Sequence, residues 1–165
     1  PCVQRLNHEL SELPIYDPVS FIGEFLIDRL ELQQLEETVL IHPTCSNRKA
    51  GHVAKMQVIA EKCAQIVGLP HTVTCCGTAG DRGIFHPELP EKALNSLQSQ
   101  IPKNCSLGIS NSRTCELGLS MVSDVKFESM FHLLLKASKP KIESAGRFEF
   151  WQFVEDNRLS HDRLS

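Results

Sequence analysis

Four cysteines in three separate segments are the residues of this chain best suited to chemistry. Cys45 and Cys115 each follow a short apolar run, while Cys75 and Cys76 stand side by side before Gly77. Thiolates bind soft metals, above all iron–sulfur clusters and zinc. Neighbouring cysteines form a disulfide with difficulty, because Cα atoms joined by a trans peptide are about 3.8 Å apart. The pattern therefore favours a metal centre held by all four thiols.

Residues on either side of the thiols are predicted to support such a centre. Gly77 would let the backbone come close to the sulfurs and direct amide groups at them. Cys115 would lie near the start of a helix, where the helix dipole favours its thiolate. Arginine side chains could offset the negative charge of a thiolate cluster. The predicted supporting residues are Gly77, Gly80, Arg82, Ser112 and Arg113, and no catalytic residue is predicted.

The other cysteines and the histidines are expected to be structural. Cys63 lies on an apolar helix face, and Cys2 and Cys105 are also expected to pack as small apolar side chains. The histidines are expected mostly at the surface or at helix caps, with His42 and His86 next to the predicted thiol edge. These residues stand outside the predicted ligand set, and a role beside or at the metal stays open for His42 and His86 alone.

Helical and extended segments alternate along the chain in a way that would position the thiols. Short apolar runs at 38–41, 71–74 and 105–110 predict strands. Helices are predicted from Asp17–Pro18, over 53–67 with Gly68 as the stop, from Pro87, from Asn111 or Ser112, and over 127–135. This alternation predicts an α/β fold, a parallel sheet with flanking helices in three layers. The cysteines would then lie at the carboxyl ends of the strands, where such sheets bind ligands.

Composition limits the classes of function. The chain has 165 residues, of which 41% are hydrophobic and 22% charged, so it can bury a core. The net charge of -3 gives no basic surplus of the kind that nucleic acid attracts, and no nucleic-acid partner is expected. The longest aliphatic run, Leu133–Leu135, is far too short to span a bilayer. An odd count of 7 cysteines is typical of a reducing compartment, which predicts a cytoplasmic location.

A boundary is predicted near Lys139. Residues 1–139 form the predicted cysteine-rich domain, and residues 140–165 form an aromatic C-terminal arm or linker. The aromatic cluster around Trp151 is expected to dock on this domain or on a neighbouring one. Because the chain starts at Pro1 rather than Met, we expect it to be part of a longer protein.

The cysteine motifs resemble the CCG-type cysteine-rich domain. That domain occurs in heterodisulfide reductase subunits and in iron–sulfur subunits of glycolate, lactate and glycerol-3-phosphate oxidising systems. Its pattern is a Cys, a gap, Cys-Cys-Gly, a similar gap and Cys-x-x-Cys. Here 29 residues separate Cys45 from Cys75, and 38 separate Cys76 from Cys115. Ser112 stands where the family often has a further cysteine, so the resemblance implies four thiolates, which suffice for a [4Fe–4S] cluster.

The strings at 42–49, 74–83 and 110–116 are also similar to the C-terminal region of long, FAD-linked D-lactate dehydrogenases. Such proteins join an FAD-binding part, a ferredoxin-like iron–sulfur part and a CCG domain. The resemblance covers about residues 15–138. It implies an electron-transfer domain that receives electrons from flavin after oxidation of D-lactate or another 2-hydroxy acid. The electrons would pass towards a cytochrome or quinone.

The same resemblance limits what this chain is expected to do by itself. FAD would bind to the parent protein, outside this segment, so the segment alone is not expected to oxidise lactate. The parent would place it in the cytoplasm or at the cytoplasmic face of the inner membrane. Two alternatives remain open: a zinc-stabilised structural or docking module, and thiol–disulfide chemistry between Cys45 or Cys115 and the pair Cys75–Cys76.

Overall fold

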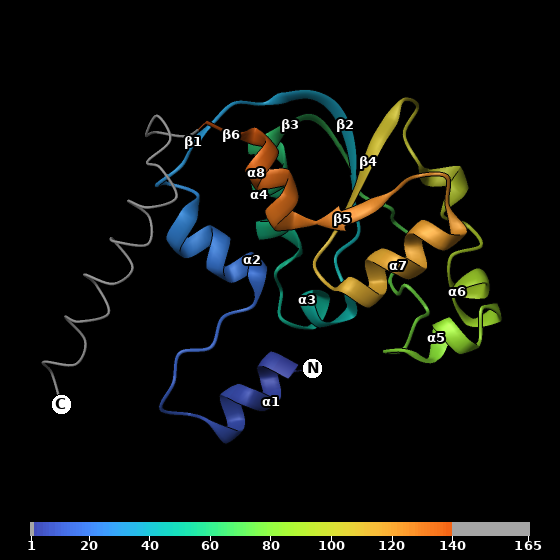
Figure 1. The fold of residues 1–165 in the computed structure, drawn as a ribbon, viewed down its shortest axis with the longest axis horizontal. Coiled ribbons are helices and arrows are strands. Elements are labelled where there is room, and N and C mark those ends of the chain that lie inside the picture. Colours follow the sequence, from blue (N-terminus) through green and yellow to red (C-terminus); the bar gives the residue numbers. More distant parts are fainter. Residues whose placement is uncertain (1, 140–165) are drawn as a thin grey trace, which may run out of the picture.

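A four-stranded parallel sheet forms the centre of the computed structural model, which describes residues 2–139 (Figure 1). Its strand order is β3-β2-β4-β5. The strands are β2 (Leu35–Ile41), β3 (Ala64–Gly68), β4 (Cys105–Ser110) and β5 (Phe127–Ser129). All three neighbouring pairs are parallel. The predicted α/β class is confirmed, and the predicted arm at 140–165 lies outside the described residues.

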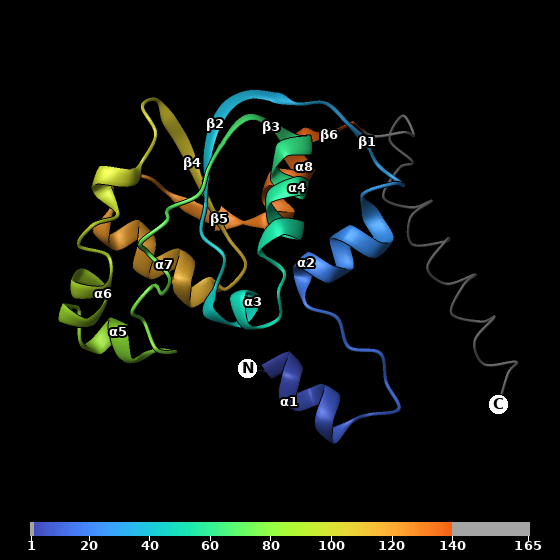
Figure 2. The same cartoon turned by 180° about the vertical axis from the view of Figure 1, so that it is seen from behind.

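Helices cover both faces of this sheet (Figures 1 and 2). On one face lie α2 (Pro18–Phe21) with the π-helical turn η1 (Ile22–Leu26), α4 (Val53–Cys63) and α8 (Met130–Ala137). On the other lie α6 (Glu88–Ala93) and α7 (Arg113–Val122). The remaining elements are α1 (Cys2–Glu9), α3 (Cys45–Lys49), α5 (Arg82–Phe85), the 3-10 turn η2 (Gln98–Gln100), and a small antiparallel pair of β1 (Glu31–Leu32) with β6 (Ser138–Lys139).

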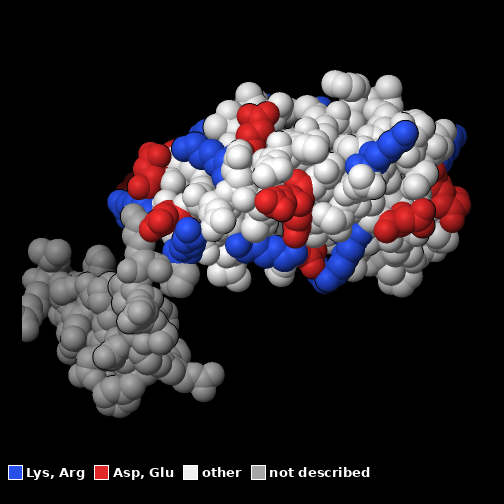
Figure 3. Space-filling view, turned by 90° about the horizontal axis from the view of Figure 1, so that it is seen from above, with Lys and Arg blue, Asp and Glu red and all other residues white. Residues whose placement is uncertain are grey.

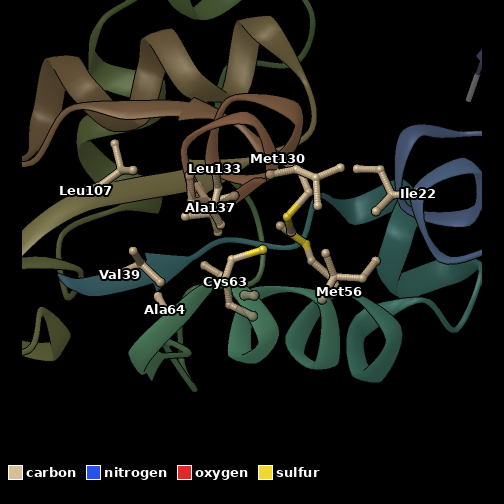
Figure 4. Packing of buried hydrophobic residues seen from close by; sticks show 14 of the residues in the cluster. Ile22, Val39, Met56, Cys63, Ala64, Leu107, Met130, Leu133 and Ala137 are labelled. Atoms are coloured by element: carbon tan, nitrogen blue, oxygen red, sulfur yellow. The ribbon is translucent and has the colours of Figure 1, made fainter. Parts of the chain in front are cut away.

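Alternating side chains of β2 divide the core into two clusters. Val39 and Ile41 pack among the side chains of α4 and α8, whereas Leu40 packs with those of α7. This is the period of two that a strand imposes on its side chains. In Figure 4, Met56 and Met130 point into the first of these clusters. Both faces of the sheet are therefore buried, as is typical of parallel sheets.

One predicted helix is wrong at its end. The helix predicted over 53–67 ends at Cys63, and β3 begins at Ala64. Ile66 and Val67 pair with β2 instead of extending the helical face. Helical spacing and β-branched residues both fit this stretch, and pairing with β2 decides between them.

The strand predicted at 71–74 is also wrong. Residues 71–74 have no strand pairing. The backbone amides of His71 and Thr72 instead donate to the side-chain oxygen of Gln100, at 2.8 and 3.2 Å. Their donors are thus partly satisfied by a side chain, and the segment crosses from β3 towards α6 as a loop.

The helix predicted over 127–135 begins later than expected. Phe127 starts β5, which pairs with β4 through Gly108. The side chain of Ser129 then accepts a hydrogen bond from the amide of Phe131 and caps α8. The helix start at Asp17–Pro18 and the strands covering 38–41 and 105–110 occur as predicted.

The described surface carries charges of both signs. In Figure 3, acidic and basic side chains are interspersed on the visible face, and neither sign forms a continuous patch there. Among residues 2–139, no helix is both long and apolar enough to cross a bilayer.

Candidate thiol site at the carboxyl edge of the sheet

Cys45 is placed at this edge by β2 and α3. The strand ends at Ile41, and α3 begins at Cys45 after the cap residue Thr44. The Thr44 hydroxyl accepts from the amide of Asn47 at 3.3 Å and donates to the side-chain oxygen of Asn47 at 2.8 Å. This reciprocal pair fixes the turn after the strand, and the Cys45 side chain remains exposed.

Cys76 and Cys115 come into direct contact. Their sulfur atoms lie 2.7 Å apart, and the residues are only 5% and 7% exposed. Cys115 lies in the first turn of α7, which follows β4, and Cys76 lies in the loop after β3. Two segments that are distant in sequence thus deliver a pair of thiols to the same buried point.

The contact shifts the pKa values of the two thiols in opposite directions. The pKa of Cys76 falls to about 6, first because of its hydrogen bond with the Cys115 thiol; burial opposes this fall, and the contact with the Thr78 hydroxyl adds to it. The pKa of Cys115 rises because its proton is held by Cys76, because it is buried, and because the charges of Cys76 and Cys45 oppose a second thiolate. Of the two thiols, Cys76 is therefore the one that loses its proton more readily.

Cys75 and Cys45 occupy a different position from this pair, because both side chains are exposed. The Cys75 sulfur accepts a hydrogen bond of 3.4 Å from the amide of Gly77. The structure therefore joins two of the predicted thiols in direct contact. In residues 2–139, no three His, Cys, Asp or Glu side chains are grouped so that they could hold a metal ion.

Glycine allows the Cys-Cys-Gly loop to pack closely. Gly77 has a φ of +73°, and a Cβ there would lie 2.6 Å from the Leu89 carbonyl oxygen and 2.7 Å from Pro90 Cα. Gly80 also has a positive φ, +79°, in open space. At Gly77 both the positive φ and the close neighbours disfavour a side chain, whereas at Gly80 only the positive φ does so.

The predicted arginines and Ser112 have varied surroundings. Arg82 is exposed on α5. The Arg113 side chain, 75% exposed, pairs with the buried carboxylate of Glu116 at 3.0 Å. Ser112 precedes α7, and its hydroxyl lowers the pKa of Cys115 against the larger opposing effects. Of the three, only Ser112 acts on a thiol of the pair.

Sequence reasoning missed two buried residues at this edge. Thr78 is 2% exposed, and its hydroxyl oxygen lies 3.0 Å from the Cys76 sulfur. His42, expected at the surface or at a cap, is fully buried at the end of β2, and its pKa falls to about 4 through burial and the nearby charge of Arg48. The adjacency of Thr78 to Cys-Cys-Gly was the only sequence signal for the first. The burial of His42 follows from the tertiary structure alone.

Arg48 ties α3 to the segment that carries the tandem cysteines. Its guanidinium donates to the Val73 carbonyl at 3.3 Å. Val73 itself is buried in the same cluster as Cys76 and Cys115. The three thiol-bearing segments are therefore held together by contacts besides the sulfur pair.

The thiols fit an iron–sulfur cluster by their chemistry, since four cysteines are its usual ligands. The distance between the sulfurs of Cys76 and Cys115 must change before a cluster could bind. In a [4Fe–4S] cluster each cysteine thiolate binds a different iron, so the ligand sulfurs do not touch one another. The sulfurs of Cys76 and Cys115, at 2.7 Å, would have to move apart before both could bind metal.

A cavity of about 350 Å³ lies beside this edge. Its lining includes Asp17, Asn47, His52 and Ser112. The Asp17 carboxylate is 3.0 Å from the His52 ring.

Comparisons of the chain with protein-family models, with curated proteins and with solved structures found no match.

Proposed function

We propose that this chain is an iron–sulfur electron-transfer domain whose ligands are Cys45, Cys75, Cys76 and Cys115. The observation that carries the proposal is the meeting of Cys76 and Cys115 at one buried point. It joins thiols from two segments at the carboxyl edge of a parallel sheet, where Cys45 also begins α3. Such an edge is the usual ligand-binding place of this sheet type.

A bound cluster would accept and release single electrons. The residues of the chain would provide its surroundings. Burial of Cys76 and Cys115 excludes water from two of the sulfurs. The amide of Gly77 donates to Cys75, and the hydroxyl of Thr78 lies 3.0 Å from the Cys76 sulfur, where it can donate to a thiolate. These donors would stabilise negative charge on the sulfurs.

The wider setting of the proposal comes from the resemblance to FAD-linked D-lactate dehydrogenases. In such a parent, flavin would oxidise a 2-hydroxy acid, and this domain would pass the electrons towards a cytochrome or quinone. Partners would be the FAD-binding and ferredoxin-like parts of the parent chain. The parent would lie in the cytoplasm or against the cytoplasmic face of the inner membrane.

Reconstitution of the full chain with iron and sulfide, without oxygen, tests the proposal. We expect about four irons per chain and a broad visible absorption that dithionite bleaches. Serine at 45, 75, 76 or 115 should each reduce iron retention strongly. Cys105→Ser is the matched control, because Cys105 is half-buried on β4 and its sulfur contacts the Leu107 carbonyl. Failure to retain iron, or equal loss in the control, would overturn the proposal.

The sulfur contact also favours a second candidate function, a redox-active thiol pair. In that reaction the Cys76 thiolate attacks a small-molecule disulfide and releases one thiolate. The Cys115 thiol, after losing its proton, then attacks the Cys76 sulfur and releases the second. The products are an intramolecular disulfide and two small thiols. Alkylation with and without prior reduction should then differ by two thiols, and peptide mapping should assign both to Cys76 and Cys115.

A further inference from the structure

The hydroxyl of Thr78 contacts the sulfur of Cys76. Its oxygen lies 3.0 Å from the Cys76 sulfur, and the residue is 2% exposed. Its backbone carbonyl accepts from the amide of Gly83 at 2.8 Å. A buried hydroxyl needs a hydrogen-bond partner, and the sulfur of Cys76 is the one that the structure gives to Thr78.

Two glycines, Gly83 and Gly118, leave the space that Thr78 occupies. A Cβ on Gly83 would lie 2.7 Å from Thr78 Cα, so α5 can approach the loop only without a side chain there. A Cβ on Gly118, in α7, would collide with the methyl group of Thr78. The methyl group therefore packs against α7, and the hydroxyl, on the same β-carbon, contacts the sulfur.

We propose that Thr78 is a positioning residue that fixes the Cys76 sulfur by hydrogen bonding and raises the reduction potential of the site. This inference deepens the proposed iron–sulfur function and rests on it. A hydrogen bond to a ligand sulfur stabilises the form with more negative charge, which is the reduced form of a cluster. Removing the hydroxyl should therefore move the midpoint potential to a more negative value.

Two substitutions separate the hydroxyl from the shape of the side chain. Thr78→Val keeps the branched shape and loses the hydrogen bond. Thr78→Ser keeps the hydroxyl and loses the methyl group. With the reconstituted full chain, we expect a negative shift of potential in Thr78→Val and a potential near that of the original chain in Thr78→Ser. An unchanged potential in Thr78→Val, or an equal shift in both variants, would overturn the inference.

A second measurement does not depend on iron. The rate at which iodoacetamide modifies Cys76 in the iron-free chain, followed by peptide mass mapping, reports the contact between the Thr78 hydroxyl and the Cys76 sulfur. Thr78→Val should be modified severalfold more slowly, with roughly the original rate in Thr78→Ser. Equal rates in all three proteins would contradict the hydrogen bond itself. A slower Thr78→Val in a chain that retains no iron would uphold the positioning role and reject the cluster.

Discussion

The sulfur atoms of Cys76 and Cys115 lie 2.7 Å apart, although the residues are separated by 39 positions in sequence. The contact depends on two junctions: the loop after β3, and the turn between β4 and α7. It makes one thiol of the pair a donor and the other an acceptor. The pH dependence of the site follows from this asymmetry.

Cys76 should react with alkylating agents as a low-pKa thiol. Its pKa, lowered to about 6, means that the reactive thiolate is present above pH 6 and is lost as the pH falls below it. Cys115→Ala removes the largest cause of the lowered pKa and should move the midpoint of the alkylation profile to higher pH. Cys115→Ser keeps a hydroxyl donor and should move it less. A profile that Cys115→Ala leaves unchanged would show that the pair does not share a proton.

Cys63 should behave in the opposite way. It is fully buried at the end of α4, and burial raises its pKa to about 11. It should resist alkylation in the folded protein and react once urea unfolds the chain. Cys45, which is exposed, provides the internal control and should react without denaturant. Equal rates for the two cysteines in native buffer would contradict the packing between α4 and the sheet.

Gly118→Ala should destabilise the protein, even though alanine favours helices. At an open helical position this change would add about 0.5–1 kcal/mol to the free energy of unfolding. In α7 the new Cβ would collide with the Thr78 methyl group, so we expect a net loss of about 1–3 kcal/mol. Urea unfolding measures it. Leu117→Ala, on the exposed side of the same helix, should have a smaller effect.

The Asp17 carboxylate should contribute to stability as the cap of α2. It accepts from the amides of Val19 and Ser20 and lies 3.0 Å from the ring of His52. Asp17→Ala should reduce the free energy of unfolding by about 1–2 kcal/mol, measured by thermal or urea unfolding. Asp28→Ala is the comparison, since Asp28 is 89% exposed and 4.0 Å from Lys62. Equal losses in both variants would argue against a capping role.

Local signals were enough for the strands around 38–41 and 105–110 and for the helix start at Asp17–Pro18. A continuous apolar run and a capping carboxylate before proline act within a few residues of chain, so the sequence alone carries them. The α/β class followed from the alternation of such segments. The boundary at Cys63–Ala64 did not follow, because pairing of Ile66 with Thr38 decides it.

For the candidate site, too, some features were predictable from the sequence and others depend on the tertiary structure. Residue type and position after the predicted strands made Cys45, Cys75, Cys76 and Cys115 the predicted ligands, because thiolates bind soft metals. The tertiary structure alone determined that Cys76 meets Cys115 while Cys45 and Cys75 stay exposed. It also brought Thr78 to the sulfur, because α7 packs against the Cys-Cys-Gly loop at a glycine. Distances between remote segments depend on the packing of whole helices on the sheet, which no local pattern in the sequence encodes.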